Sequence, residues 1–233
     1  AYIERDRNFK NLVRDFKVVE DADFEVPVSL QKALRKYQET GYRWLRTLDT
    51  YGFGGILADD MGLGKTLQVI ALLLSSKGNG TAVIITPASL VYNWGEEFKR
   101  FAPELNVCLV TGTQKERYEH IKMWQRYDVL VTSYDHLKRD IAEYEDCEFA
   151  YEILDEAQYI KNHMTAASKA VKVVHSRQRF ALTGTPIENR LSELWSIFDY
   201  LMPGYLYSYE GFRKEFEMPI VKQQDDAVSK RLK

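Results

Sequence analysis

Residues 56–66, ILADDMGLGKT, contain the residue types that bind the phosphates of a nucleotide. The general phosphate-loop pattern is G-x-x-x-x-G-K-[ST] between a strand and a helix, and Asp59 stands where the first glycine is expected. In this pattern the glycines let backbone N–H groups surround phosphate oxygens, Lys65 reaches the outer phosphates, and Thr66 holds Mg²⁺. Replacing the first glycine removes none of these contacts. The segment therefore predicts a nucleotide site, with a plain glycine-rich turn before a helix as the alternative.

A second segment, YEILDEAQ (residues 151–158), is an apolar run that ends in two acids. Asp155 at the tip of a strand can hold the Mg²⁺ that bridges phosphates, and Glu156 can orient and deprotonate the attacking water. Paired acids at a strand end are also common helix caps, so the pair alone proves little. Its presence in the same chain as the phosphate loop makes the catalytic interpretation the better one. The absence of an N-K-x-D pattern argues against a GTPase.

The elements that must position these groups alternate along the chain. Short β-rich runs, separated mostly by segments of helical period, read GGILA, TAVIITP, NVCLVTG, DVLVTSY, YEILDE and FALTGTP. This succession predicts an α/β fold of three layers, with a mainly parallel sheet and helices on both faces. In such sheets the site lies at the carboxyl ends of the strands. An amphipathic helix is expected from Leu30 to Leu48, and a helical appendage after Gly204.

Composition limits the classes of partner. The 32 basic and 34 acidic residues give a net charge of −2, so any nucleic-acid contact needs a local patch. The apolar runs are far shorter than the roughly 20 residues that cross a bilayer. We therefore expect no membrane partner and a cytoplasmic protein, associated with the nucleoid in a bacterium or nuclear in a eukaryote. The first residue is not Met, and we expect a piece of a longer protein.

Three motifs together carry a family resemblance. ADDMGLGKT, DEAQ and LTGTPIENRLSELWS (residues 182–196) resemble, in this order, motifs I, II and III of superfamily-two helicases. The long third motif resembles the Swi/Snf family of ATP-dependent DNA translocases, its bacterial members in particular. That family commonly has D-E-M-G-L-G-K-T in the loop, so Asp59 falls where the family has an acid. The resemblance implies a RecA-like P-loop NTPase fold.

The resemblance also implies roles for individual residues. LRKYQETGYRWL (residues 34–45) resembles the Q motif, which implies that Arg35 and Gln38 contact the adenine nucleotide. The loop residues implied to bind ATP are Asp60, Met61, Gly62, Leu63, Gly64, Lys65 and Thr66. The implied catalytic residues are Lys65, Asp155 and Glu156, and the implied Mg²⁺ ligands are Thr66 and Asp155. The residues implied to couple ATP to motif III are Gln158, Thr183, Gly184 and Thr185. Gly184 permits a tight turn, so the hydroxyls of Thr183 and Thr185 can hydrogen-bond toward the carboxylate pair.

Two further segments imply contacts with double-stranded DNA. TPASLVYNW and TSYD resemble motifs Ia and Ib, which bind the DNA backbone in the family. The residues implied to do so here are Thr86, Pro87, Ser89, Thr132 and Ser133. Backbone contacts imply no base specificity. Trp94 and Trp195 lie in amphipathic helices, so we expect them in the core rather than stacked on bases.

The implied organisation is an N-terminal arm or linker over 1–29, a first RecA-like ATPase lobe over 30–204, and the beginning of a helical protrusion over 205–233. The second RecA-like lobe, which supplies the arginine fingers in the family, is not in this sequence, so we expect weak nucleotide binding and little turnover from the fragment. The implied function is the first ATPase lobe of a DNA-dependent ATPase that acts as a double-stranded DNA translocase or helicase-like remodeller. Expected partners are duplex DNA, the second lobe and protein components of a nucleoprotein complex. The alternatives are a non-catalytic DNA-binding or scaffold module and a strand-separating superfamily-two helicase.

Overall fold

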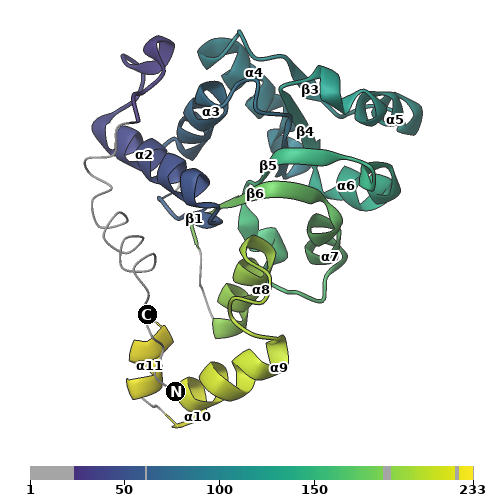
Figure 1. Cartoon of the computed structure of the whole chain (residues 1–233). Helices are drawn as coiled ribbons and strands as arrows, with labels where there is room; N and C mark the ends of the chain where they lie inside the picture. Colours follow the sequence, from purple (N-terminus) through teal and green to yellow (C-terminus); the bar gives the residue numbers. More distant parts are fainter. Residues whose placement is uncertain (1–23, 61, 186–189, 224–225, 233) are drawn as a thin grey trace.

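A computed structural model of the chain describes residues 24–60, 62–185, 190–223 and 226–232. Its centre is a six-stranded sheet in the order β1-β6-β5-β2-β4-β3, and every pairing between these strands is parallel. The strands are β1 (Gly55–Leu57), β2 (Ala82–Thr86), β3 (Val107–Leu109), β4 (Val129–Ser133), β5 (Glu148–Leu154) and β6 (His175–Leu182). All six match β-rich runs identified in the sequence, and the α/β fold is confirmed (Figure 1).

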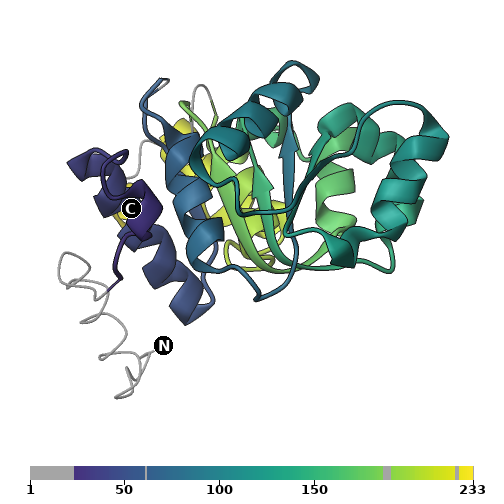
Figure 2. The same ribbon diagram turned by 90° about the horizontal axis from the view of Figure 1, so that it is seen from above.

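Helices cover both faces of the sheet (Figures 1 and 2). One face carries α2 (Lys36–Tyr51), α3 (Lys65–Ser75) and α4 (Val91–Phe101). The other carries α5 (Gln114–Lys122), α6 (Tyr134–Asp140), α7 (Ala166–Val173) and α8 (Leu191–Leu201). Along β5, Tyr151 and Ile153 belong to the first core and Leu154 to the second, as expected when successive residues of a strand point to opposite faces.

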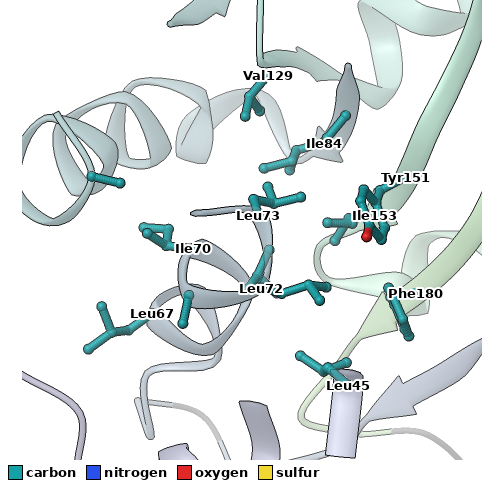
Figure 3. Packing of buried hydrophobic residues seen from close by; sticks show 14 of the residues in the cluster. Leu45, Leu67, Ile70, Leu72, Leu73, Ile84, Val129, Tyr151, Ile153 and Phe180 are labelled. Carbon is teal, nitrogen blue, oxygen red and sulfur yellow. The ribbon is translucent and has the colours of Figure 1, made fainter. Parts of the chain in front are cut away.

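The helix that follows the phosphate loop, α3, is held in place by its buried side chains. Ile70 and Leu72 have no exposed surface and pack, with Leu67 and Leu73, against side chains of the sheet (Figure 3). Truncating one such buried leucine or isoleucine to alanine typically costs about 2–5 kcal/mol. The amino end of α3 is therefore held in place by a rigid core.

The start of α2 differs from the sequence-based expectation. The predicted helix began at Leu30, whereas the structure has a short 3₁₀ turn, η2 (Val28–Leu30), and α2 begins at Lys36. The reason is local, because Gln38 Oε1 accepts the backbone N–H of Arg35 at 2.8 Å and so satisfies a donor at the helix end. Residues before η2 also pack on α2, because the hydroxyl of Tyr42 in α2 donates to the carbonyl of Glu25. The packed part of the chain therefore begins before the predicted boundary at 30.

The end of the chain is helical, as predicted, with α9 (Tyr209–Phe212), a π-helical turn η7 (Arg213–Glu217), α10 (Met218–Gln223) and α11 (Asp226–Leu232). Phe212 and Phe216 pack with Trp195 of α8 in a small separate core. These elements form the yellow end of the ribbon beyond α8 (Figure 1). No helix within the described ranges combines the length and the apolar character needed to cross a membrane.

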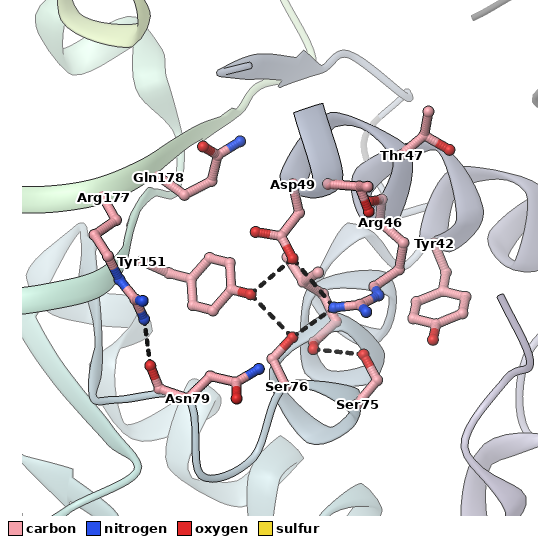
Figure 4. A network of polar contacts seen from close by, with 12 residues as sticks. Tyr42, Arg46, Thr47, Asp49, Ser75, Ser76, Asn79, Tyr151, Arg177 and Gln178 are labelled. Carbon is pink, nitrogen blue, oxygen red and sulfur yellow. Dashed lines mark hydrogen bonds and ion pairs between the residues drawn. The ribbon is translucent and has the colours of Figure 1, made fainter. Parts of the chain in front are cut away.

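A polar network joins α2, the residue that caps the end of α3, and the middle of β5 (Figure 4). The Tyr151 hydroxyl lies 2.9 Å from Asp49 Oδ2 and 3.0 Å from Ser76 Oγ, and Arg46 reaches both partners. Burial raises the pKa of Tyr151 to about 12. The network stays neutral at the tyrosine and fastens α2 to the sheet away from the strand ends that carry the sequence motifs.

Candidate functional site

The phosphate loop connects β1 to α3. Gly62 and Gly64 have φ of 81° and 72°, values that favour glycine, and α3 begins at Lys65 directly after them. The Lys65 ammonium donates to the carbonyl oxygens of Asp59, at 2.7 Å, and Asp60, at 3.1 Å. The cation is therefore held at the loop by oxygen atoms. Met61 lies outside the described residues.

The Q-motif residues contact the loop itself. Gln38 is buried, and its Nε2 donates to the carbonyl of Leu63 at 3.0 Å and approaches that of Gly64 at 3.4 Å. Tyr37 donates to the same Leu63 carbonyl. Because the other end of the Gln38 amide accepts the N–H of Arg35, both ends of the side chain are engaged within the protein. Contact of Gln38 with the adenine base and of Arg35 with the nucleotide stays a prediction.

Asp155 follows β5 and is tightly held. Its Oδ2 accepts from the Trp94 indole N–H at 2.8 Å and the Thr86 hydroxyl at 3.0 Å, and its Oδ1 accepts the backbone N–H of Glu156. Burial raises the pKa of Asp155, and the bonds from Trp94 and Thr86 oppose that rise by stabilising the carboxylate. Asp155 is therefore held in one orientation by three hydrogen bonds at the carboxyl end of its strand.

Trp94 is in the core, as predicted, with 1% of its surface exposed. Its second role, as a donor to Asp155, was not predicted from the sequence. A buried tryptophan N–H usually finds a hydrogen-bond partner, which signals that a partner exists without identifying it. Trp94 reaches Asp155 because α4 follows β2 in the chain and β2 is the neighbour of β5 in the sheet.

Glu156 adopts φ of 50°, an uncommon left-handed conformation for a residue with a side chain. Its Oε2 accepts from Gln158 Nε2 at 2.7 Å, and Gln158 Oε1 accepts from the Thr183 hydroxyl at 3.1 Å. Thr183 in turn accepts the N–H of Thr185 at 3.0 Å, across half-buried Gly184. The predicted hydrogen bonding from the end of β6 toward the carboxylate pair is present, with Gln158 as the bridge.

The residues predicted to bind DNA lie at the ends of β2 and β4. The side chains of Thr86, Thr132 and Ser133 are buried, Thr86 donates to Asp155, and Ser133 accepts the N–H of His136 as the cap of α6. Pro87 is buried too, whereas Ser89 is exposed. The buried side chains are enclosed by the protein, and contact of these five residues with DNA stays a prediction.

A tyrosine pair links the end of β4 to the carboxylate site. The Tyr134 hydroxyl donates to the carbonyl of Asp155 at 2.9 Å, and its ring is stacked on Tyr159, with centroids 4.9 Å apart and planes 4° apart. Tyr134 is buried and Tyr159 is exposed. Both segments predicted to contact DNA are thus bonded directly to Asp155, a connection that the sequence analysis did not anticipate.

The residues present fit Mg²⁺ with a nucleotide. Thr66 is the second residue of α3, where the phosphate-loop pattern puts the hydroxyl that holds the metal. Asp155 Oδ1 accepts one hydrogen bond, and a carboxylate oxygen has capacity for more than one partner. Within the described ranges no group of three or more His, Cys, Asp or Glu side chains is placed to hold a metal ion by itself.

Comparison with known proteins identifies the family. The SNF2-related domain profile matches residues 37–233. The chain is 37% identical over 243 residues to the TATA-binding protein-associated factor MOT1 of Saccharomyces cerevisiae, covering 98% of this chain and 13% of that protein. It is 40% identical over 226 residues to the putative ATP-dependent helicase/translocase YwqA of Bacillus subtilis, covering 94% and 24%.

Among solved structures, the SWI2/SNF2 ATPase core of Sulfolobus solfataricus in complex with double-stranded DNA matches with a TM-score of 0.81 and 41% identity, covering 90% of this chain and 44% of that chain. The chain thus spans less than half the length of each of these proteins. The family resemblance drawn from the three motifs is confirmed. A profile match over most of its length, joined to a parallel sheet like that of an SNF2 ATPase core, shows that the chain belongs to the SNF2-related domain family.

Proposed function

We propose that the chain is the first ATPase lobe of a DNA-dependent ATPase that moves along double-stranded DNA without separating its strands. One observation carries this proposal. The phosphate loop follows β1, the coupling segment follows β6 and the carboxylate pair follows β5, and these three strands are neighbours in a parallel sheet. The groups that hydrolysis needs therefore share one edge of the sheet.

Each side chain has a role that its position supports. Lys65 leaves the carbonyls of Asp59 and Asp60 to bind the outer phosphates of ATP, and the N–H groups at the start of α3 add their positive potential. Thr66 and Asp155 would hold Mg²⁺, which neutralises charge on the transferring phosphoryl group when bound. Glu156 orients the attacking water and takes its proton. Its carboxylate has lone pairs available for this role, because Gln158 donates only to Oε2.

Coupling to DNA would run through the bonds between strand ends. Gln158, Thr183 and Thr185 connect Glu156 to the segment after β6, as the proposal for the third motif requires. The DNA backbone would contact the segments after β2 and β4. Hydrolysis would also need a second RecA-like lobe that supplies positive charge to the transferring phosphoryl group, a contribution worth roughly 10³–10⁵ in rate.

The nucleotide part of the proposal is tested by titrating the chain with a fluorescent ATP analogue and Mg²⁺. We expect measurable binding that Lys65→Ala abolishes. Lys99→Ala is the matched control, because Lys99 is an exposed lysine in the last turn of α4 and pairs with Glu96. Equal affinity of wild type and Lys65→Ala would contradict the assignment of the loop.

The DNA part is tested by ATP hydrolysis with and without duplex DNA. We expect little turnover from the chain alone and DNA-stimulated turnover from a protein that carries both lobes. Triplex displacement on a blunt duplex, without unwinding of a forked one, would support translocation. Unwinding of the fork would favour a strand-separating helicase, and DNA binding without any hydrolysis by the two-lobed protein would favour a scaffold module.

A further inference from the structure

Asp59, at the position of the missing first glycine, is bonded twice to α3. Its carboxylate Oδ2 accepts from Gln68 Nε2 at 2.9 Å, and its carbonyl accepts from Lys65 Nζ at 2.7 Å. Gln68 lies in the first turn of α3 and is fully buried. The start of the phosphate loop is therefore attached to the helix by two side chains, one of which is the lysine proposed to bind phosphate.

The position of Gln68 depends on a glycine in another helix. A Cβ at Gly41 of α2 would lie 1.8 Å from Gln68 Oε1 and 2.9 Å from its Cδ, both far inside contact distance. Gly41 has no left-handed backbone that would call for glycine, and glycine inside a helix costs about 1 kcal/mol relative to alanine. The space for the Gln68 amide is the reason that the structure offers for this glycine.

The arrangement carries a second cost. Gln68 Oε1 is buried and has no hydrogen-bond partner among the described residues. A buried polar atom without a partner costs about 1–3 kcal/mol. Only the Nε2 end of the amide has a hydrogen bond, and that bond goes to Asp59. The glycine inside α2 and the unpaired Gln68 Oε1 are both unfavourable for stability, and both accompany the single bond from Gln68 to Asp59. Unfavourable features that persist together indicate that this bond matters for function.

We propose that Gly41, Gln68 and Asp59 form a positioning unit that holds the phosphate loop in its nucleotide-binding conformation. Gln68 anchors the Asp59 carboxylate in place of the tight turn that a first glycine would allow. The anchored Asp59 keeps the loop backbone next to Lys65, which leaves the Asp59 carbonyl when it binds phosphate, and Gly41 supplies the space that Gln68 needs. The unit contacts no nucleotide and acts through the loop and Lys65. This inference rests on the proposed function, because it assumes that the loop binds the phosphates of a nucleoside triphosphate.

The test compares nucleotide affinity with stability in one set of variants. Gln68→Met keeps the length of the side chain and removes the amide, and Asp59→Ala removes the acceptor in the half-exposed loop without touching the core. We expect each to weaken binding of the fluorescent ATP analogue about tenfold, the scale of one lost hydrogen bond to a charged group. The double variant should lose no more than either single one, and Asp59→Asn, which keeps an acceptor oxygen, should stay near wild type.

Gly41→Ala should also weaken binding and lower stability in urea unfolding. Adding Gln68→Ala should restore the stability, because the clash is gone, while affinity stays low. Gln178→Met is the control, since Gln178 is a buried glutamine that donates to the carbonyl of Phe53 from β6. It should lower stability and leave nucleotide affinity unchanged.

The outcomes separate the two levels of the proposal. Loss of binding in Lys65→Ala with affinity within about twofold of wild type in both Gln68→Met and Asp59→Ala would overturn the positioning unit and leave the proposed function standing. Unchanged affinity in Lys65→Ala would overturn the proposed function itself. If Gln68→Met fails to fold, Asp59→Ala alone decides, because a weakened affinity supports the unit and a wild-type affinity refutes it.

Discussion

Replacing Trp94 by phenylalanine tests whether the core tryptophan positions the proposed metal ligand. The substitution keeps an aromatic ring near Phe98, whose centroid lies 5.9 Å away, and removes the N–H that donates to Asp155 Oδ2 at 2.8 Å. Asp155 retains the Thr86 hydroxyl and the Glu156 N–H. The carboxylate would stay buried with one donor fewer.

The size of the effect follows from that bond. A hydrogen bond to a charged group contributes about 1.5–3 kcal/mol, and each 1.4 kcal/mol is a factor of ten in an equilibrium constant. Because Mg²⁺ needs the ionised, oriented carboxylate, we expect Trp94→Phe to reduce the Mg²⁺-dependent gain in nucleotide affinity by about tenfold or more. Affinity measured in EDTA should change little, since the phosphate loop is untouched.

The assay is a titration with the fluorescent ATP analogue at several Mg²⁺ concentrations and in EDTA. Trp195→Phe is the matched control, because Trp195 is also buried but donates its N–H to the carbonyl of Tyr207 in the helical end of the chain. Thr86→Val should resemble Trp94→Phe. The reasoning is refuted if Trp94→Phe folds and keeps the full Mg²⁺-dependent gain, or if Trp195→Phe loses as much.

Three further substitutions test other parts of the structure. Burial raises the pKa of Glu152 from 4.5 to about 8 despite its ion pair with Arg179. Between these two pH values Glu152 is therefore protonated in the folded chain and ionised in the unfolded chain. The free energy of unfolding should therefore fall as the pH rises from 4.5 to about 8 because of this group, and Glu152→Gln should remove that fall in urea unfolding at pH 5 and 7. Tyr151→Phe should lower the free energy of unfolding by about 1–2 kcal/mol, because one buried hydroxyl is lost, and leave nucleotide affinity unchanged. Thr183→Val should preserve nucleotide binding and lower DNA-stimulated hydrolysis by the two-lobed protein, since it breaks the link to Gln158; unchanged hydrolysis would argue against this relay.

Local patterns were enough to predict the sheet and the location of the candidate site. The β-rich runs located all six strands, but they missed the first residues of β5 and the polar first half of β6, His175–Arg179, which has no apolar pattern. The phosphate loop, the pair Asp155–Glu156 and Thr183 were found because their spacing is local. In a parallel sheet such residues must gather at the carboxyl edge, whatever the order of the strands.

Side-chain partners could not be predicted in the same way. The choice between Gln38 as a base contact and Gln38 as the cap of α2 depends on which carbonyls lie nearby in the fold. Trp94 was correctly placed in the core, but its donation to Asp155 requires that β2 and β5 be neighbours. Gly41 reads as an interruption of a helical pattern until the position of Gln68 is known.

Asp155 is hydrogen-bonded to residues at the carboxyl ends of two other strands. The order β5-β2-β4 puts the carboxyl ends of these strands side by side, and Asp155 is bonded to Thr86, the last residue of β2, and to Tyr134, which follows β4. A rigid core lies behind all three strands, so a shift at either segment cannot be absorbed there. If DNA contacts these segments as proposed, its binding would reach the Asp155 carboxylate through Thr86 and the Asp155 backbone carbonyl through Tyr134. Stimulation of hydrolysis by DNA then needs no movement of the phosphate loop, which the separate bonds of Gln68 and Gln38 hold in place.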